Sequence, residues 1–410
     1  MEILMFGWEF PPFSSGGLGT ACYGLTRGLT NQGVDITFVL PRIEGALDCD
    51  YMRILAAEKG RLKFKTIDAA LRPYMTSKAY NDFIRDFGLK GFGGASLYGR
   101  ELFEEVDRYA RAAEAIAEDG DFDVIHCHDW MTYRAGIHAR KAAEKMGRKV
   151  PLIAHIHSTE FDRTGGHPQG YVYYLEWEGL READYIVAVS DYTKGMVVRH
   201  YSIDPKKIHV IHNAIDYEEK APAETPKIKE FHKIVLFLGR ITIQKGPDHF
   251  LRIAKRIAEV DDNVRFIVVG SGDMFRHIVE ESANLGIGDK VLFADFLSGK
   301  DVERAYRMAH VYVMPSISEP FGLTALEAMK YGTPVVISKQ SGVSEVIKNC
   351  LVVDFWDVNR MVDRIMAVLK YKELRDTMSM EGVEEIKRFS WREPAKKCLE
   401  LYRRAMKKKW

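Results

Sequence analysis

The segment SEPFGLTALEAM, from Ser318 to Met329, follows the strand-like apolar run Val311–Pro315 and opens a helix. Pro320 disfavours helical backbone at the residue before it, so the carboxylate of Glu319 is expected on an extended loop. Glu327 lies about one turn inside the helix, where an acidic side chain can accept hydrogen bonds from a ribose diol. A strand, a loop and a helix in this order predict an α/β sheet with a ligand site beyond the carboxyl end of the strand.

The start of this helix predicts an anion site. Glycine lets a ligand approach the backbone closely, and the first amides of a helix lack intrahelical partners and favour a phosphate group. The amides concerned belong to Gly322, Leu323 and Thr324. An ordinary helix with proline before it and acid near its start would account for a lone carboxylate pair. It does not account for the whole string, which therefore favours a diphosphate site.

Strand and helix patterns alternate along most of the chain, which predicts parallel sheets covered on both faces. The polar, proline-containing segment Tyr217–Lys229 divides the alternation into two parts. The fold class is therefore α/β, with two doubly wound Rossmann-like domains facing each other across a deep cleft: residues 1–218, residues 219–390, and a final helix over 391–410. Residues 43–99 fit least well and read as loops and short helices. The strands are expected at Ile3–Gly7, Asp35–Leu40, Asp123–His126, Pro151–His155, Tyr185–Ser190, Ile208–His212, Ile234–Gly239, Val264–Gly270, Val291–Ala294, Val311–Pro315, Pro334–Ile337 and Leu351–Val353.

Composition excludes several classes of protein. The 410 residues carry 59 Lys and Arg against 58 Asp and Glu, a balance that argues against a general nucleic-acid binder. The five cysteines are scattered and form no CxxC, which argues against a disulfide framework and fits a reducing cytoplasm. The longest apolar runs, such as Ile234–Leu238, are far shorter than the roughly 20 residues of a transmembrane helix. We expect a cytoplasmic protein without a membrane span.

Two basic residues follow the first strand of the second domain, in the string GRITIQKG. The guanidinium of Arg240 and the ammonium of Lys245 can hold a leaving diphosphate and stabilise the charge that develops on it. Two solvated surface charges would be the plainer explanation. Both residues are expected at the same sheet edge as Gly322, and this favours the phosphate clamp.

Two histidine pairs mark strand ends in the first domain. His126 and His128 precede Asp129 and Trp130, and His155 and His157 open the string HIHSTEFDR. Each pair lies on one face of its strand because the two residues are two positions apart. Sugar recognition beside Trp130 is the favoured interpretation; a metal site and ordinary strand-end histidines are the alternatives.

Four further features are weaker. Gly17 lies in a glycine loop after the first strand, and Asn213 follows Ile208–His212 towards the cleft, although each would also suit an ordinary turn. Asp48 and Asp50 match a DxD metal motif superficially, but no strand clearly precedes them, so chance is the better explanation.

The tail 407–409 is three lysines, which could touch acidic lipid. A terminal helix packed on the body is the favoured alternative. Its apolar face would consist of Trp391, Ala395, Cys398, Tyr402 and Met406.

The chain resembles the retaining nucleotide-sugar glycosyltransferases of the two-Rossmann (GT-B) type, and HSTEFDR points to the glycogen and starch synthase branch. The resemblance covers nearly the whole chain. One departure is Ser14, which holds the place of the lysine that starch-type synthases carry before the glycine pair. Relatives with sucrose-like, lipid or other small acceptors often lack that lysine. The motifs that carry the resemblance are FPPFSSGGLG, HCHDW, HSTEFDRTGG, VSDYTK, IHNAID, GRITIQKG, GSGD, SEPFGLTALEAM and SKQSGVSEV.

The resemblance implies a role for each candidate residue. Arg240, Lys245 and the amides of Gly322 to Thr324 would hold the donor diphosphate, Glu327 the ribose, and Glu319 the transferred sugar ring. His157 would contact the sugar on its leaving side, and Gly17 would let the glycine loop close on the donor. Asp129 and Asn213 would lie in the sugar or acceptor region. The resemblance further implies that no metal and no cofactor are needed, and that the final helix crosses back onto the first domain.

We therefore expect a retaining enzyme that moves glucose from UDP- or ADP-glucose to an α-glucan, in the manner of a glycogen synthase. The nearer alternative is the same chemistry with a small-molecule or lipid acceptor. The alternative from another class is a metal hydrolase built on the four histidines. Bound metal and no affinity for nucleotides would identify it.

Overall fold

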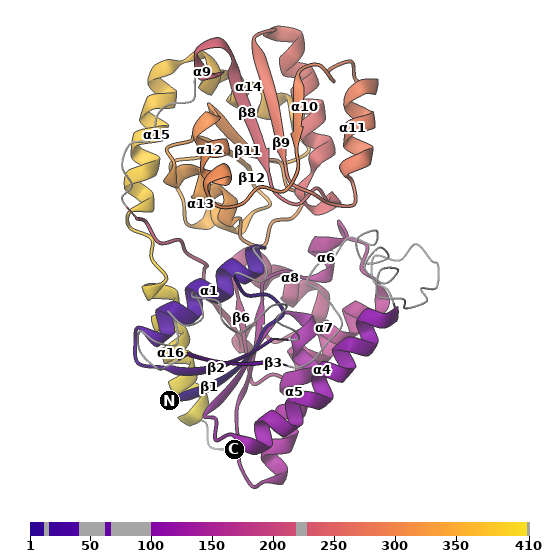
Figure 1. The fold of residues 1–410 in the computed structure, drawn as a ribbon, viewed down its shortest axis with the longest axis vertical. Coiled ribbons are helices and arrows are strands. Elements are labelled where there is room, and N and C mark those ends of the chain that lie inside the picture. The colour runs from indigo at the N-terminus through magenta and orange to yellow at the C-terminus, as the bar shows by residue number, and fades with distance from the viewer. Residues whose placement is uncertain (12–15, 41–61, 67–99, 219–227, 408–410) are drawn as a thin grey trace.

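The computed structural model describes residues 1–11, 16–40, 62–66, 100–218 and 228–407. They form two lobes, one above the other in Figure 1. The predicted linker falls partly in residues 219–227, outside the described part, so the predicted domain boundaries stay predictions. Ser14, Asp48, Asp50 and the last two lysines of the tail also lie outside it.

The first lobe is built on a seven-stranded sheet in the order β3-β2-β1-β4-β5-β6-β7, with every pair parallel. The order turns back at β1 and β4, where successive crossovers go to opposite sides of the sheet. In chain order, the first-lobe elements are β1 (Glu2–Phe6), α1 (Gly17–Thr30), β2 (Asp35–Leu40), β3 (Leu62–Thr66), α4 (Arg100–Asp119), β4 (Val124–His128), α5 (Trp130–Lys145), β5 (Leu152–Ile156), α6 (Glu160–Arg163), α7 (Gly170–Glu182), β6 (Tyr185–Ala188), α8 (Asp191–Tyr201) and β7 (Ile208–Val210).

The second lobe repeats the architecture with six parallel strands in the order β10-β9-β8-β11-β12-β13. Its elements are α9 (Ile228–Phe231), β8 (Lys233–Leu238), α10 (Pro247–Val260), β9 (Val264–Val269), α11 (Phe275–Asn284), β10 (Val291–Ala294), α12 (Lys300–Met308), β11 (Val311–Met314), α13 (Leu323–Lys330), β12 (Val335–Ser338), β13 (Leu351–Val353), α14 (Val358–Lys370) and α15 (Lys372–Ile386). The predicted fold class, two doubly wound domains, is confirmed.

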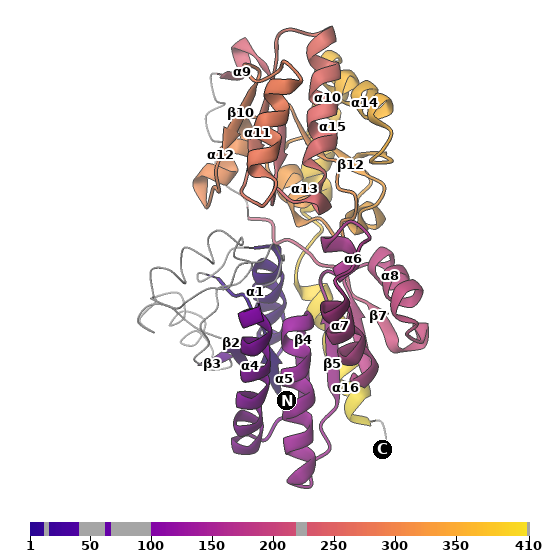
Figure 2. The same ribbon diagram turned by 90° about the vertical axis from the view of Figure 1, so that its right-hand side faces the viewer.

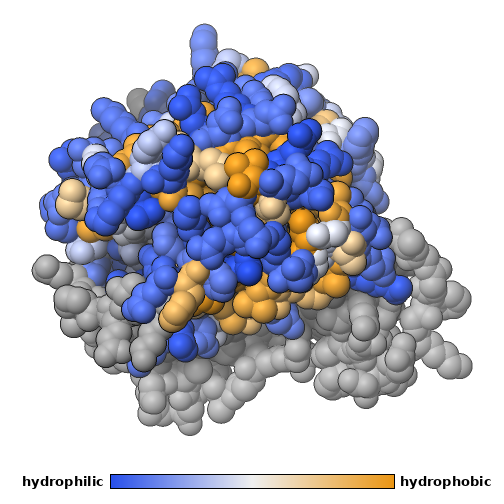
Figure 3. Space-filling view, turned by 90° about the horizontal axis from the view of Figure 1, so that it is seen from above, coloured by the Kyte–Doolittle hydropathy of each residue, from blue (hydrophilic) through white to orange (hydrophobic). Residues whose placement is uncertain are grey.

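Each sheet is sandwiched between layers of helices, which the view turned by 90° separates most clearly (Figure 2). The central strands are buried on both faces: every residue of β4 and β5 is buried, as are all residues of β1 after Glu2. The outward face of the second lobe is mostly hydrophilic, with smaller apolar areas between the charged side chains (Figure 3). No helix among the described residues is long and apolar enough to cross a membrane.

One strand was missed from the sequence. Residues 62–66, inside the stretch read as loops and short helices, form β3 at the edge of the first sheet beside β2. The sequence LKFKT alternates apolar and charged residues, which suits an edge strand. This signal is too short to stand out against its surroundings.

The last helix, α16 (Arg392–Lys407), returns to the first lobe and lies along α1 (Figure 1). Its inner face carries Ala395, Cys398 and Tyr402, all fully buried, as the periodicity predicted. The prediction that Met406 belongs to this apolar face is wrong, because Met406 is 39% exposed and Ala405 is buried in its place. Fourteen residues make nearly four full turns, so Ala405 faces the same way as Trp391 more closely than Met406 does.

Close contact between α1 and α16 depends on glycine. A Cβ atom on Gly28 would lie 2.6 Å from the carbonyl oxygen of Trp391 and 2.8 Å from the Cβ of Ala395. Replacing Gly28 with alanine should push the helices apart. We expect Gly28→Ala to destabilise the protein by about 1–3 kcal/mol, despite the higher helix propensity of alanine.

Thermal unfolding of purified variants measures this effect. Gly195→Ala is the matched control, because Gly195 also lies inside a helix but its Cβ position has no neighbour nearer than 3.8 Å. The control should unfold at the wild-type temperature or slightly above it. Equal shifts in the two variants would contradict the account of the helix contact.

Candidate active site

Two predicted motifs meet at the carboxyl ends of β8 and β11, which are neighbours in the second sheet. The Nζ atom of Lys245 lies 2.5 Å from Oε2 of Glu319, and the hydroxyl of Ser316 donates to the same oxygen at 3.2 Å. Glu319 is 5% exposed, and the Lys245 side chain is 20% exposed. Arg240 lies in the same loop as Lys245 and is exposed. The structure therefore brings the basic loop and the Glu319 loop together, as their predicted place at one sheet edge implied.

Glu319 lies on extended backbone, as Pro320 predicted. Its amide donates to the carbonyl of Gln340 at 2.8 Å, and its carbonyl accepts from the amide of Gly342 at 2.9 Å. It forms an isolated parallel bridge with Ser341. Hydrogen bonds from its amide and to its carbonyl hold the backbone of Glu319 beside residues 340–342.

Helix α13 begins immediately after Gly322, whose φ of 112° lies in a region that favours glycine. Because glycine has no side chain, residue 322 cannot cap the helix, and the first-turn amides of α13 receive no hydrogen bond from a capping side chain there. The side chain of Thr324 is directed towards Tyr312, whose hydroxyl donates to the Thr324 hydroxyl at 2.8 Å. The backbone geometry is therefore suited to an anion, as predicted for Gly322, Leu323 and Thr324.

Glu327 lies one turn further on and is half-buried. The hydroxyl of Tyr306, on α12, donates to its Oε2 at 2.9 Å. Burial raises the pKa of Glu327, and the Tyr306 hydrogen bond offsets part of that rise. Tyr306 was not singled out from the sequence, where an aromatic residue on a helix resembles any core residue.

In the first lobe the two histidine pairs stack at the ends of β4 and β5. His126 Nε2 lies 3.2 Å from His155 Nδ1, and His128 Nδ1 lies 3.0 Å from His157 Nε2. Within each pair the rings stack, with centroids 4.5 Å and 4.2 Å apart. Burial lowers the pKa of all four imidazoles, to about 3 for His128, so the cluster is uncharged at neutral pH. His126 also lies 2.5 Å from the hydroxyl of Tyr402 on α16.

Asp129 is the most constrained of the predicted residues. It has a φ of 62°, unusual for a residue other than glycine, and it is 1% exposed. Its Oδ1 accepts from the amides of His157 and Ser158 at 2.7 and 3.3 Å, whereas its buried Oδ2 has no hydrogen-bond partner among the described residues. Burial raises its pKa to about 6. Backbone strain and a buried oxygen without a hydrogen-bond partner are both typical of residues in ligand-binding sites.

The remaining predicted residues are placed less decisively. Gly17 is the exposed first residue of α1, with open space at its Cβ position. Asn213 is 8% exposed and follows β7 by three residues in the chain. Trp130 is 2% exposed and packs within the first core, and sugar recognition beside it stays a prediction. It opens α5, whose apolar face turns it inwards.

Metal-ligating atoms lie close together in three groups of the described residues: Cys22, His128 and His157; His126, His128 and His155; and Asp191, His212 and Glu345. The histidine nitrogens of the first two groups already lie within hydrogen-bonding distance of one another across the strands. That the site needs no metal and no cofactor stays a prediction, with an experiment given below.

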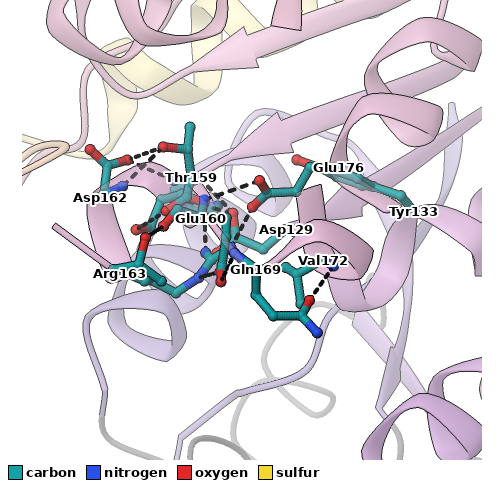
Figure 4. A network of polar contacts seen from close by, with 12 residues as sticks. Asp129, Tyr133, Thr159, Glu160, Asp162, Arg163, Gln169, Val172 and Glu176 are labelled. Atoms are coloured by element: carbon teal, nitrogen blue, oxygen red, sulfur yellow. Dashed lines mark hydrogen bonds and ion pairs between the residues drawn. The ribbon is translucent and has the colours of Figure 1, made fainter. Parts of the chain in front are cut away.

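Residues after β5 form a buried polar network that the sequence signalled only as a motif (Figure 4). Arg163 is paired with Glu160 at 3.0 Å and with Glu176, and it donates to the carbonyl of Ser158 at 2.9 Å. Thr159 caps α6 in a capping box with Asp162. The network orders HSTEFDR and fixes the backbone amides that hold Asp129.

Comparisons with known proteins identify the class. Residues 219–384 match the family Glycosyl transferases group 1, and residues 15–219 match Glycosyltransferase Family 4. An uncharacterised glycosyltransferase of Methanocaldococcus jannaschii is 30% identical over 427 residues, covering 99% of each chain. The D-inositol 3-phosphate glycosyltransferase of Kribbella flavida is 31% identical over 336 residues, covering 75% of this chain and 78% of that protein. The chain belongs to the group 1 glycosyltransferases of GT-B type.

Solved structures share the fold. Sucrose-phosphate synthase from Thermosynechococcus elongatus superposes with a TM-score of 0.74 at 20% identity, covering 98% of both chains. HepE from Anabaena, in complex with UDP and glucose, gives a TM-score of 0.69 at 17% identity, covering 98% of this chain and 100% of that one.

The buried carboxyl of Asp129 generates a pH prediction. Its pKa of about 6 lies above the roughly 3.9 of an unfolded aspartate. Between these values the folded chain binds the proton more tightly, so this group makes the protein less stable as pH rises. Asp129→Asn keeps the Oδ1 acceptor and removes the ionisation. We expect the variant to be more stable than the wild type above pH ~6, by about 2–3 kcal/mol.

Thermal unfolding of both proteins from pH 4 to pH 8 checks this. The histidine cluster contributes alike to both curves, so the difference isolates Asp129. The advantage of the variant should shrink steadily below pH ~6 and be almost gone at pH ~4, where the folded carboxyl is protonated and about half of the unfolded carboxyls are. A difference that stays constant over the whole range would contradict the raised pKa.

Proposed function

We propose that this glycosyltransferase transfers glucose from UDP- or ADP-glucose with retention of the α configuration. The observation that carries the proposal is the 2.5 Å contact of Lys245 with Glu319 beside the start of α13. It supports a site in which cations, helix amides and a carboxylate surround one point. A diphosphate needs the first two groups, and a sugar ring with several hydroxyls suits the third.

In the proposed mechanism, countercharge does most of the work. Arg240 and Lys245, with the amides of Gly322 to Thr324, stabilise the negative charge that grows on the diphosphate as the glycosidic bond breaks. Lys245 is held by Glu319, and this contact would orient its ammonium towards the site. Approach of the two lobes would exclude water and protect the donor from hydrolysis.

The remaining groups are proposed to orient the sugar and the nucleoside. Glu319 would accept hydrogen bonds from the glucose hydroxyls, and Glu327, fixed by Tyr306, from the ribose. His157 would contact the sugar on its leaving side as a neutral imidazole. Asp129, with its unpartnered Oδ2, and Asn213 would face the sugar or the acceptor.

The proposed acceptor is an α-glucan, as the resemblance of HSTEFDR to glycogen synthases implies. A second candidate is a small phosphorylated acceptor. It is favoured by the relatives named D-inositol 3-phosphate glycosyltransferase, one of which is 31% identical over 75% of the chain. The alternative of a metal hydrolase is set aside because the chain belongs to a glycosyltransferase family.

A screen of donors against acceptors tests the proposal directly. UDP- and ADP-glucose, each with glycogen, maltooligosaccharides or inositol phosphates, are assayed for release of nucleoside diphosphate, and NMR of the product gives the anomeric configuration. Acceptor-dependent release with an α-linked product supports the proposal, and the productive acceptor chooses between the two candidates. Release at the same rate without any acceptor, or a β-linked product, would overturn it.

Lys245→Ala and Arg240→Ala should each lower turnover far more than stability. Loss of a contact that acts mainly in the transition state costs about 2.7–4 kcal/mol, or roughly 100- to 1,000-fold in rate. The matched control is Lys255→Ala, which removes a lysine of the same lobe that pairs with Glu259 on its own helix. Steady-state kinetics should show near-normal turnover in the control. Near-normal turnover of either site variant would remove that residue from the phosphate clamp.

Activity should survive exhaustive chelation. A leaving diphosphate needs countercharge from a divalent cation or from protein groups, and here Arg240, Lys245 and the start of α13 supply it. Transfer rates before and after EDTA treatment, with metal analysis of the protein, test this. Loss of activity that Mn²⁺ or Zn²⁺ restores would instead assign a metal to the histidine cluster.

A further inference from the structure

The loop that carries Glu319 is held by the first lobe on both sides of that residue. On one side, the hydroxyl of Ser318 donates to Oδ1 of Asp162 in α6 and lies 2.8 Å from the hydroxyl of Tyr192 in α8. On the other side, the carbonyl of Pro320 accepts from Ser190 at 2.6 Å and from Thr193 at 3.2 Å. Two elements of the first lobe thus contact the residues on either side of Glu319: the side chain of Ser318 and the carbonyl of Pro320.

The contacts between the lobes at this point are buried and closely packed. Ser190, Thr193 and Asp162 are fully buried, and Ser318 is 5% exposed. A Cβ atom on Gly342 would lie 2.2 Å from the carbonyl oxygen of Pro320 and 2.5 Å from the Cβ of Ser190. The lobes therefore approach at this point as closely as a glycine allows.

The start of α8 is itself anchored to the second lobe. The carboxylate of Glu345 accepts from the amides of Asp191 and Tyr192 at 2.9 and 2.7 Å and lies 2.8 Å from Nε2 of His212. Burial would raise the pKa of Glu345, but the bonds from His212 and the two amides hold it below its ordinary value. The hydroxyls of Tyr192 and Thr193 therefore reach the Glu319 loop from a fixed helix end.

Among the described residues, the backbone and carboxylate of Glu319 bond to four residues of the second lobe: Gln340, Gly342, Lys245 and Ser316. Its neighbours in sequence are bonded to the first lobe. A shift of α8 would be passed to Glu319 through a single peptide unit on either side. The direction of the carboxylate therefore depends on contact between the lobes.

We propose that Tyr192 and Thr193 are positioning residues through which the first lobe sets the direction of the Glu319 carboxylate for sugar transfer. The inference rests on the proposed function, in which Glu319 contacts the transferred sugar. Tyr192 acts through Ser318, and Thr193 acts through the carbonyl of Pro320. Transfer is then coupled to lobe contact, so donor bound to a separated pair of lobes reacts slowly.

The test is the double variant Tyr192→Phe/Thr193→Val. It removes both hydroxyls with little change in shape and keeps Ser190, which caps α8. Because a small displacement of a reacting group can cost up to about 100-fold in rate, we expect kcat to fall by about 10- to 100-fold. The affinity for UDP should stay within about threefold of wild type, since the groups proposed to bind nucleotide do not touch these hydroxyls.

Two companion variants make the result specific. Tyr173→Phe is the matched control, because it also removes one tyrosine hydroxyl of the first lobe, which donates to the carbonyl of His200 at 3.1 Å. Thr193→Ser keeps the hydroxyl and should retain near-normal kcat. In the background of Glu319→Gln, the double variant should lower kcat no further, because the carboxylate that it positions is already gone.

The outcomes separate the inference from the proposed function. If Glu319→Gln itself leaves kcat unchanged, the proposed role of Glu319 fails. If Glu319→Gln lowers kcat but the double variant does not, or if the two losses multiply, the positioning role is overturned and the contacts only stabilise the interface. Should the double variant not fold, Tyr192→Phe alone carries the same comparison, with a smaller expected loss and the same reading of each outcome.

Discussion

The contact of Lys245 with Glu319 is the interaction on which the proposed chemistry depends. It joins the ends of two strands through an ion pair that is largely removed from water. Such a pair gains little net stability, because the cost of desolvation offsets much of the attraction. Its value lies in orientation: the ammonium is held at the mouth of an anion site, where a diphosphate can share it. A buried cation without Glu319 would be costly before the donor arrives.

Sheet topology creates this contact. The first residues of β8 and β11, Lys233 and Val311, lie 78 positions apart in the chain, yet the two strands are neighbours at the centre of the second sheet. The strand order turns back at this pair, where loops diverge and leave a crevice. The first lobe turns back in the same way between β1 and β4, which places Asp129 and the histidines at its own crevice. In the proposed mechanism, one crevice serves the donor and the other the acceptor.

Much of this arrangement could be predicted from sequence because local patterns carry it. The strands β2, β10 and β13 have the bounds that their apolar runs predicted. Strand adjacency in a parallel sheet brought Lys245 to Glu319. The features that could not be predicted are those that depend on contacts between distant parts of the chain. The burial of Trp130 and the bond of Ser318 to Asp162, 156 residues away, depend on packing that no local pattern encodes.

The histidine cluster shows the same limit. The i, i+2 spacing predicted two pairs, each on one face of its strand, and the structure has them. Whether the pairs would hold a metal or one another depended on the register of β4 against β5, which aligns His128 with His155. That register lies beyond single-sequence reasoning.

The central claim is that two carboxylates on one segment divide the donor between them. Isothermal titration with UDP and ADP of the wild type, Glu319→Gln and Glu327→Ala tests it most directly. If Glu327 binds the ribose and Glu319 the sugar, Glu327→Ala should lose about 10- to 100-fold in affinity for the preferred diphosphate. Glu319→Gln should lose much less, because its amide oxygen can still accept from Lys245. Equal loss of affinity in both variants would contradict the division.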